Sequence, residues 1–369
     1  MKGSWQIGRI FGIDLKIHFT FPFLLAWVAI STVMAGGEAF TVLAEVGVIL
    51  VLFLFVILHE FGHALMARRF GIATTDITVL PIGGLARLEK MPEDPREEFL
   101  VAIAGPAVNV LIGGLLFAGL LITGFFAQPL NITAVVDNIW LQLLTANIVL
   151  VLFNLIPAFP MDGGRVLRAI LASRMDSVKA TQIAANVGRG FAVVMGIVGI
   201  FFNPFLILTA LFVWSGAGAE AKAVEVKAGL KGLVVRDALI SQFYQVDANQ
   251  PLAGVFQLSM ETGQHNLPVT SNGRFLGLIR RSDLLKAIER LGGRAPAYAA
   301  IGLEPQGLDP EMPLSDILEK FGTSRVYPVI ENGQLIGLIT TESVQQRMWL
   351  NQRMGTAGPN PPEETVNPV

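Results

Sequence analysis

The chain has 369 residues, of which 52% are hydrophobic and 15% are charged. Ordinary globular domains carry about 25% charged residues, so this composition, with a mean hydropathy of +0.57, indicates a protein that lies in large part in a membrane. The formal net charge of −2 argues against a nucleic-acid partner, and the absence of cysteine excludes disulfides and thiolate metal ligands.

The N-terminal region is expected to lead into a first membrane span. Met1 to His18 is interpreted as a cytoplasmic or interfacial segment with Trp5 as an anchor at the membrane surface. Its three cations resemble those of a signal peptide, but no A-x-A cleavage site follows, so Phe19 to Ala35 is predicted to be a retained span. Gly36 to Glu45 is predicted to be a short loop.

The second predicted span, about Val46 to Ala67, contains the sequence HEFGH. On a helix, positions i and i+4 share a face, so His59 and His63 point the same way with Glu60 beside them. Two histidines so placed, with an adjacent carboxylate, are the helical half of a zinc-hydrolase site. A charge at the centre of a membrane costs on the order of 2.5–3.5 kcal/mol, so we interpret these residues as functional.

Two features that follow have more than one interpretation. The β-branched alternation over Thr74 to Glu89, broken by Pro and Gly, predicts a short strand or hairpin that is either an edge able to bind an extended peptide or a plain connector. The third span is predicted at about Phe99 to Phe125. Its stretch from Gly105 to Asn109, with the sequence GPAVN, favours close helix packing over a role in a site.

The fourth uncharged run, Asn138 to Met161, is predicted to end in a broken helix. Two prolines and a Gly pair interrupt the sequence NLIPAFPMDGGR, which begins at Asn154. Broken backbone at membrane depth is tolerated where it is buried in protein or lines a cavity. This stretch is therefore a candidate site, with Asp162 at the break.

Beyond the break, the placement of cations predicts the topology. A basic loop is expected from Arg165, Arg168, Arg174 and Lys179. Thr181 to Ala221 then forms either one kinked span or two shorter ones. With two spans, every Lys and Arg falls on one side, and the outer loops around Glu38, Asp137 and Asn203 carry none. The positive-inside rule then predicts six spans with both termini in the cytoplasm.

After Lys222 the composition becomes that of a soluble domain with an internal repeat. Each copy is predicted to contain a strand, an Asn-Gly turn, a second strand and a helix, and the copies are spaced by about sixty residues. The last stretch, Gly355 to Val369, is rich in Pro, Gly and Glu and is predicted to be disordered.

The metal site needs a further ligand, because a catalytic zinc usually has three protein ligands and an open position for water. His18 lies at the start of the first span and His265 in the soluble repeat, so Asp162, at a comparable depth to the HEFGH histidines, is favoured. Glu60 is then the general base that moves a proton from water to the leaving amine. Asn154 is either a donor to the substrate or a residue that packs helices.

Three stretches together resemble the site-2 protease family of intramembrane zinc metalloproteases: HEFGH, AGPAVN and NLIPAFPMDGGR. More narrowly, the chain is similar to the prokaryotic subgroup with a six-span core and a C-terminal pair of CBS repeats. The resemblance implies one zinc ion per chain held by His59, His63 and Asp162, with Glu60 as catalytic base and Asn154 as a substrate or oxyanion helper. It also implies a transmembrane protein substrate, such as a membrane-tethered transcription, sigma or anti-sigma factor, in a prokaryotic plasma membrane.

The paired repeats resemble CBS motifs, which commonly bind adenine nucleotides between their two halves. The usual ribose-binding run is Gly, two hydrophobic residues, Thr or Ser, two further residues and Asp. The first half has Arg280 in place of Thr before Asp283, and the second keeps Thr340 but ends on Ser343. Asp283 and Thr340 are therefore the candidate nucleotide-binding residues. The alternative is a structural pair of repeats that forms a homodimer.

We therefore predict a multi-span α-helical membrane protein of about six transmembrane helices with a C-terminal soluble α/β CBS-repeat domain. The predicted divisions are a metalloprotease core at 1–222, a linker at 223–230, CBS repeats at 231–291 and 292–350, and a tail at 351–369. The predicted activity is zinc-dependent endopeptidase cleavage of transmembrane segments, with nucleotide binding as a candidate control. The alternative is a CBS-regulated channel or transporter whose buried His and Asp coordinate a transported ion.

Overall fold

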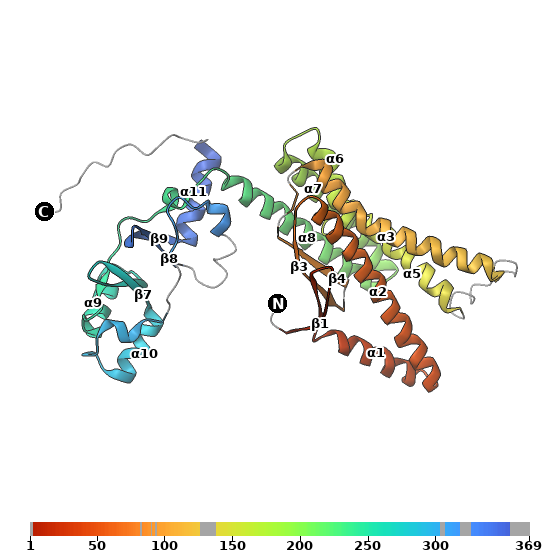
Figure 1. Ribbon diagram of the computed structural model, residues 1–369, viewed down its shortest axis with the longest axis horizontal. Helices are drawn as coiled ribbons and strands as arrows, with labels where there is room; N and C mark the ends of the chain where they lie inside the picture. The colour runs from red at the N-terminus through yellow and green to blue at the C-terminus, as the bar shows by residue number, and fades with distance from the viewer. Residues whose placement is uncertain are drawn as a thin grey trace. The chain divides into compact units, whose positions relative to one another are not determined.

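Two compact units make up the chain in the computed structural model, Met1–Val224 and Glu225–Val369 (Figure 1). The structure describes residues 3–81, 83–89, 91–92, 94–125, 138–302, 307–317 and 326–354. The predicted outer loop at Asp137 and the predicted disorder from Gly355 onward lie outside the described residues. The two units divide inside a helix that continues to Gly229, so the segment predicted as a linker is helical over most of its length.

Six apolar helices lie in the described part of the first unit. Four are long and apolar enough to cross a membrane: α2 (Ala39–Arg69), α3 (Pro95–Ile122), α7 (Ser177–Phe201) and α8 (Pro204–Gly229). Two shorter ones are α1 (Phe21–Met34) and α5 (Ile139–Asn154). In Figure 1, α3 runs beside α2 and α5. The predicted multi-span α-helical class is confirmed, with four helices of spanning length and two shorter ones, and the last apolar stretch forms two helices rather than one.

Helix α2 is longer than the span predicted around HEFGH. It begins at Ala39, with Glu38 as its N-cap residue, so the prediction of a loop from Gly36 to Glu45 is wrong from Ala39 onward. No Gly or Pro occurs in the sequence AFTVLAE that opens the helix, so nothing local stops the helix there. The single charge of Glu45 suggested a loop but is carried on the helix.

The prediction of a basic loop after Asp162 is also wrong in its first part. The expected basic loop begins with a helix, α6 (Asp162–Ala172), which buries Arg168 to 6% exposure. A buried arginine needs carboxylate partners, and these come from distant helices that the local sequence does not reveal. Arg189 lies within α7, with its guanidinium 5.7 Å from the Trp214 ring.

A four-stranded sheet accompanies the helices of the first unit. Its strands are β1 (Ser4–Ile10), β2 (Ile13–His18), β3 (Thr74–Leu80) and β4 (Gly83–Leu88), in the order β1-β2-β3-β4. The hairpin predicted over Thr74 to Glu89 is confirmed as β3 and β4, which pair antiparallel. The N-terminal segment is a second hairpin, and β2 pairs with β3 in parallel. Buried side chains of this sheet, Ile13, Ile77 and Val79 among them, pack against Phe61 of α2.

The second unit contains the predicted repeat around one five-stranded sheet of order β5-β6-β7-β9-β8. The strands are β5 (Val246–Asp247), β6 (Asn266–Ser271), β7 (Arg274–Arg280), β8 (Val326–Glu331) and β9 (Gln334–Thr340). The helices are α9 (Leu252–Thr262), α10 (Arg281–Leu291) and α11 (Thr341–Met354), with short 3-10 turns η2 (Val235–Ala238), η3 (Ala297–Ala300) and η4 (Leu314–Ile317).

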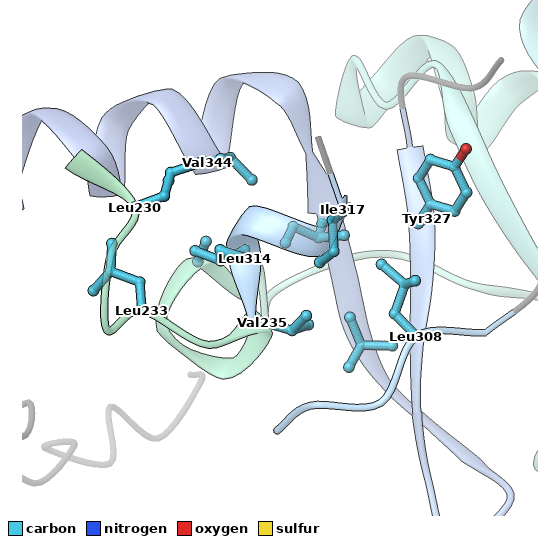
Figure 2. Close-up of a cluster of buried hydrophobic side chains, with 11 residues drawn as sticks. Leu230, Leu233, Val235, Leu308, Leu314, Ile317, Tyr327 and Val344 are labelled. Carbon is cyan, nitrogen blue, oxygen red and sulfur yellow. The ribbon is translucent and has the colours of Figure 1, made fainter. Parts of the chain in front are cut away.

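The two Asn-Gly turns predicted from the repeat are present. Asn272 and Asn332 have φ of 51° and 52°, and each following glycine is also left-handed, as tight hairpins of this type require. Figure 2 shows the core of one half, where Leu230 and Val235 lie with Leu314 and Val344 in a single buried cluster. Helix α11 continues to Met354, four residues past the predicted end of the second repeat.

Candidate metal centre

Three side chains from two helices converge in the first unit. His59 Nε2 lies 3.0 Å from Asp162 Oδ2, His63 Nε2 lies 3.2 Å from the same oxygen, and the two Nε2 atoms are 3.1 Å apart. All three residues are at least nine-tenths buried. They form the one group of three or more His, Cys, Asp or Glu residues with metal-ligand spacing found among the described residues. The structure thus brings together the three residues that the sequence nominated.

The local sequence explains how each ligand reaches this point. His59 and His63 are one helical turn apart on α2, so their rings face the same side. Asp162 begins α6 directly after the interrupted backbone that follows α5. The two glycines after Asp162 allow that turn, because a Cβ at Gly164 would lie 2.6 Å from the backbone of Ala158.

The donor set fits a divalent metal. His63 Nδ1–H donates to the Val101 carbonyl at 2.7 Å, which leaves the Nε2 lone pair directed at the cluster. An outer hydrogen bond of this kind is usual for a metal-binding histidine. A lone pair facing a carboxylate oxygen at 3.2 Å is repulsive unless a cation lies between them. His59 Nδ1 is buried and has no hydrogen-bond partner in the described part of the chain.

Gly105 of α3 leaves the space that such an ion needs. A Cβ built at this position would lie 2.6 Å from His59 Nε2 and closer still to His63 Nε2. The glycine therefore forms a wall of the cluster. The sequence favoured helix packing over a role in a site for the GPAVN stretch, and at Gly105 the structure adds a place beside the metal cluster. No signal in a single sequence separates a glycine beside a metal ligand from one at a helix crossing.

Glu60 is adjacent to the cluster in sequence, but its carboxylate points toward the sheet. Its Oε2 accepts a hydrogen bond from the Ala86 N–H of β4 at 3.1 Å. A Cβ at Gly84 would lie 2.7 Å from Glu60 Cγ, so a glycine at this position in β4 lets α2 approach the strand. The predicted base is thus held by the edge strand of the sheet, on the side away from β3.

The remaining predicted site residues lie elsewhere. Asn154 is the last residue of α5, half-buried, and no hydrogen bond to the cluster is found for it among the described residues. In the second unit, Asp283 accepts bonds from Arg280 at 2.6 and 3.2 Å. Thr340 Oγ1 accepts from the Ser343 N–H at 3.0 Å.

The two units match different family models. Residues 47–140 and 127–197 match peptidase family M50, and residues 235–290 and 304–348 match the CBS domain. A zinc metalloprotease of Methanocaldococcus jannaschii is 33% identical over 350 residues, which cover 94% of this chain and 97% of the relative. The chain belongs to peptidase family M50.

Two further likenesses each cover a little more than half of the chain. Stage IV sporulation protein FB of Bacillus subtilis is 29% identical over 195 residues, or 52% of this chain and 60% of the relative. A solved site-2 protease from Methanocaldococcus jannaschii is 37% identical, covers 59% of this chain and 95% of that chain, and superposes with a TM-score of 0.44. This M50 member is an integral membrane metalloprotease of the site-2 protease family with a C-terminal CBS pair.

Proposed function

We propose that the chain is a zinc-dependent endopeptidase that cleaves peptide bonds within transmembrane segments of membrane-tethered substrates. The observation that supports this most strongly is the buried convergence of His59, His63 and Asp162 among apolar helices. His59 lies nine residues before Arg68, about 13 Å along the helix. The cluster is thus two to three helical turns from the cationic end of α2, which in this proposal places it below the membrane surface.

His59, His63 and Asp162 would hold one zinc ion through two Nε2 atoms and one carboxylate oxygen, the ligand types that zinc accepts in the absence of cysteine. When bound, zinc supplies a Lewis acid that polarises a carbonyl and makes water a nucleophile near neutral pH. Glu60 accepts the proton of the attacking water and delivers it to the leaving amine. For this step the Glu60 carboxylate either breaks its hydrogen bond with the Ala86 N–H or keeps that bond with one oxygen while the other oxygen accepts the proton.

Asn154 and the β4 edge would position the substrate. Asn154 is placed by the chain just before the break that carries Asp162, and in this proposal its side chain donates to the substrate carbonyl. The outer edge of β4 faces α2 at Ala86, so an extended peptide paired with that edge would run beside Glu60. A transmembrane helix must unwind to pair in this way.

The wider setting is part of the same proposal. Both termini face the cytoplasm of a prokaryotic plasma membrane, and the substrates are membrane-tethered transcription, sigma or anti-sigma factors. The core, linker, repeats and tail follow the divisions predicted above, adjusted to the helix that runs through Gly229. The CBS pair binds an adenine nucleotide through Asp283 and Thr340, or joins two copies of the chain, and thereby modulates cleavage.

The decisive variant is Glu60→Gln, which keeps size and removes the base. We expect cleavage of a co-reconstituted single-span substrate to fall by at least about 100-fold while zinc content stays at one per chain. Glu45→Gln, the same change on the same helix, is the control and should cleave normally. Cleavage that survives Glu60→Gln would overturn the proposal and favour a channel or transporter, which needs His and Asp but not a base.

A further inference from the structure

The buried Arg168, six residues after Asp162 on α6, links three helices of the first unit. Arg168 Nε donates to Glu98 Oε1 at 2.6 Å, and its Nη1 donates to Glu220 Oε1 at 2.9 Å. Its Nη2 also pairs with Glu98, and its guanidinium lies 5.7 Å from the ring of the buried Phe159. Glu98 belongs to α3 and Glu220 to α8, so one side chain fixes α6 against both.

Helix α3 serves as a common reference for both ligand-bearing helices. Val101 of α3 accepts the hydrogen bond of His63, and Glu98, three residues earlier, binds Arg168. The two attachment points are therefore about 4.5 Å apart along one helix. Asp162 lies six residues before Arg168, about 9 Å along α6. A shift of α6 along α3 would separate Asp162 from His63 and would strain the Arg168–Glu98 pair.

The Arg168 ion pairs are better suited to fixing the position of α6 than to stabilising the fold. Apolar packing is non-directional, so directional bonds fix the position of a short helix such as α6 along its neighbours more tightly. A buried ion pair adds little net stability, because desolvation of the two charges offsets their attraction. The Arg168 bonds instead tie α6, whose first residue is Asp162, to α3 and α8 in the position that brings Asp162 to the histidines.

We propose that Arg168 is a positioning residue for Asp162 and that Glu220 is its adjustable partner. The Glu98 side chain is 7% exposed and that of Glu220 is 30% exposed, so Glu220 is the carboxylate that can leave. Helix α8 carries Glu220 and continues to Gly229, past the end of the first unit. A displacement of α8 would therefore pull on Arg168 through the Glu220–Arg168 ion pair and shift α6, which carries Asp162. The proposal rests on the proposed function, since it takes Asp162 as a zinc ligand.

Arg168→Met, which keeps a long side chain but no charge, is the first test. In the full-length chain in detergent, we expect zinc affinity, measured by competition with a chromogenic chelator, to fall about 10- to 100-fold. The kcat on a model substrate should fall with it, while KM changes little. Arg174→Met removes an exposed arginine just after α6 and is the matched control, with unchanged affinity and kcat expected.

Glu220→Gln isolates the adjustable partner. It should lower kcat and zinc affinity about 3- to 10-fold alone and add nothing to Arg168→Met, because both changes remove the same ion pair. A purely structural role predicts a lower unfolding temperature with unchanged zinc affinity in the folded protein, and that result would overturn the proposal. If Arg168→Met does not fold, unchanged zinc affinity in both Glu220→Gln and Arg168→Lys would overturn it equally.

The same measurements separate this proposal from the proposed function. A wild-type chain that binds zinc and cleaves, with variants that do the same, removes the positioning role and leaves the protease. A wild-type chain that binds no zinc at this cluster removes both.

Discussion

The metal cluster and the two candidate nucleotide residues differ in how their polar groups are satisfied. In the first unit, the ligand atoms of His59, His63 and Asp162 converge on one point. These three atoms do not carry enough N–H donors to satisfy every acceptor among them. In the second unit, Asp283 is bound by Arg280, whose side chain is 45% exposed. Thr340 exchanges hydrogen bonds with Ser343 at 3.0 and 3.1 Å.

This difference separates a site that needs a ligand from one that does not. Buried acceptors that face one another are costly until a cation joins them, so the metal cluster is complete only with an ion. The polar groups at Asp283 and Thr340 already have partners, so a nucleotide must displace a bond before it gains one. A motif match alone does not distinguish the metal cluster from the candidate nucleotide residues, whereas the hydrogen bonds at the two sites do.

The largest expected effect comes from filling the space at the metal cluster. In Gly105→Ala the new methyl would overlap the approach of both Nε2 atoms, and we expect zinc affinity to fall by at least about 100-fold and cleavage to be lost. Alanine favours a helix over glycine, so α3 itself should not be weakened. Zinc content after purification and chelator competition measure this. Gly114→Ala on the same helix meets nothing within 4 Å and should bind zinc normally.

If Gly105→Ala retained full zinc affinity, the cluster could relax around a methyl group. The metal site would then not be preformed, and the contrast with nucleotide residues that already have hydrogen-bond partners would be wrong.

The parts of the site that could be predicted from sequence are those fixed by covalent spacing. The period of the helix places His59 and His63 together, and the prolines and glycines before and after Asp162 predict a break at the right place. The Asn-Gly turns fix the hairpins of the repeats in the same way. In each case the deciding atoms lie within one helical turn or one β-turn of each other.

What could not be predicted depends on helix crossings. Gly105 lines the cluster because α2 and α3 approach closely, with a Cβ at Gly62 only 2.7 Å from the Ala104 carbonyl. The charge of Arg168 predicts an exposed side chain, yet the residue is buried against carboxylates that lie 70 and 52 residues away in sequence. The parallel pairing of β2 with β3 joins strands separated by a whole membrane hairpin, and no local pattern encodes it.

A smaller effect is expected at the first nucleotide residue. Arg280→Thr restores the usual ribose-binding run and frees the Asp283 carboxylate. A partly exposed ion pair is worth about 0.5–1 kcal/mol, so adenine-nucleotide affinity should rise about 2- to 5-fold. Equilibrium dialysis of the full chain with labelled ATP or AMP measures it. Arg281→Thr, which removes the neighbouring, half-buried arginine, is the control, and the nucleotide affinity of this variant should equal that of the wild type.

A fall in affinity on Arg280→Thr would show that Arg280 itself binds the phosphates. The second unit would then hold a preformed site as the first unit does, with a cation in place of the usual hydroxyl.

The smallest effect concerns Asp76, a buried carboxylate of β3 that is satisfied within the first unit. It accepts from Lys16 Nζ at 3.0 Å and from Thr78 Oγ1 at 3.0 Å, with Arg87 at 3.6 Å. Burial raises the pKa of this carboxyl, but the bonds from Lys16 and Thr78 and the nearby cations outweigh burial, so its pKa lies below the ordinary value.

A lowered folded-state pKa stabilises the fold above the unfolded value of about 3.9, and the gain is lost as pH falls through the folded value. We therefore expect wild type to lose thermal stability below about pH 4, on the order of 1 kcal/mol or about 2–4 °C in Tm. Asp76→Asn should be less stable at pH 7 and should lack this part of the acid loss. Asp14→Asn, a more exposed acid on β2, is the control for general acid effects. If Asp76→Asn kept the full acid dependence, the Asp76 carboxylate would not be its source, and this prediction would be wrong.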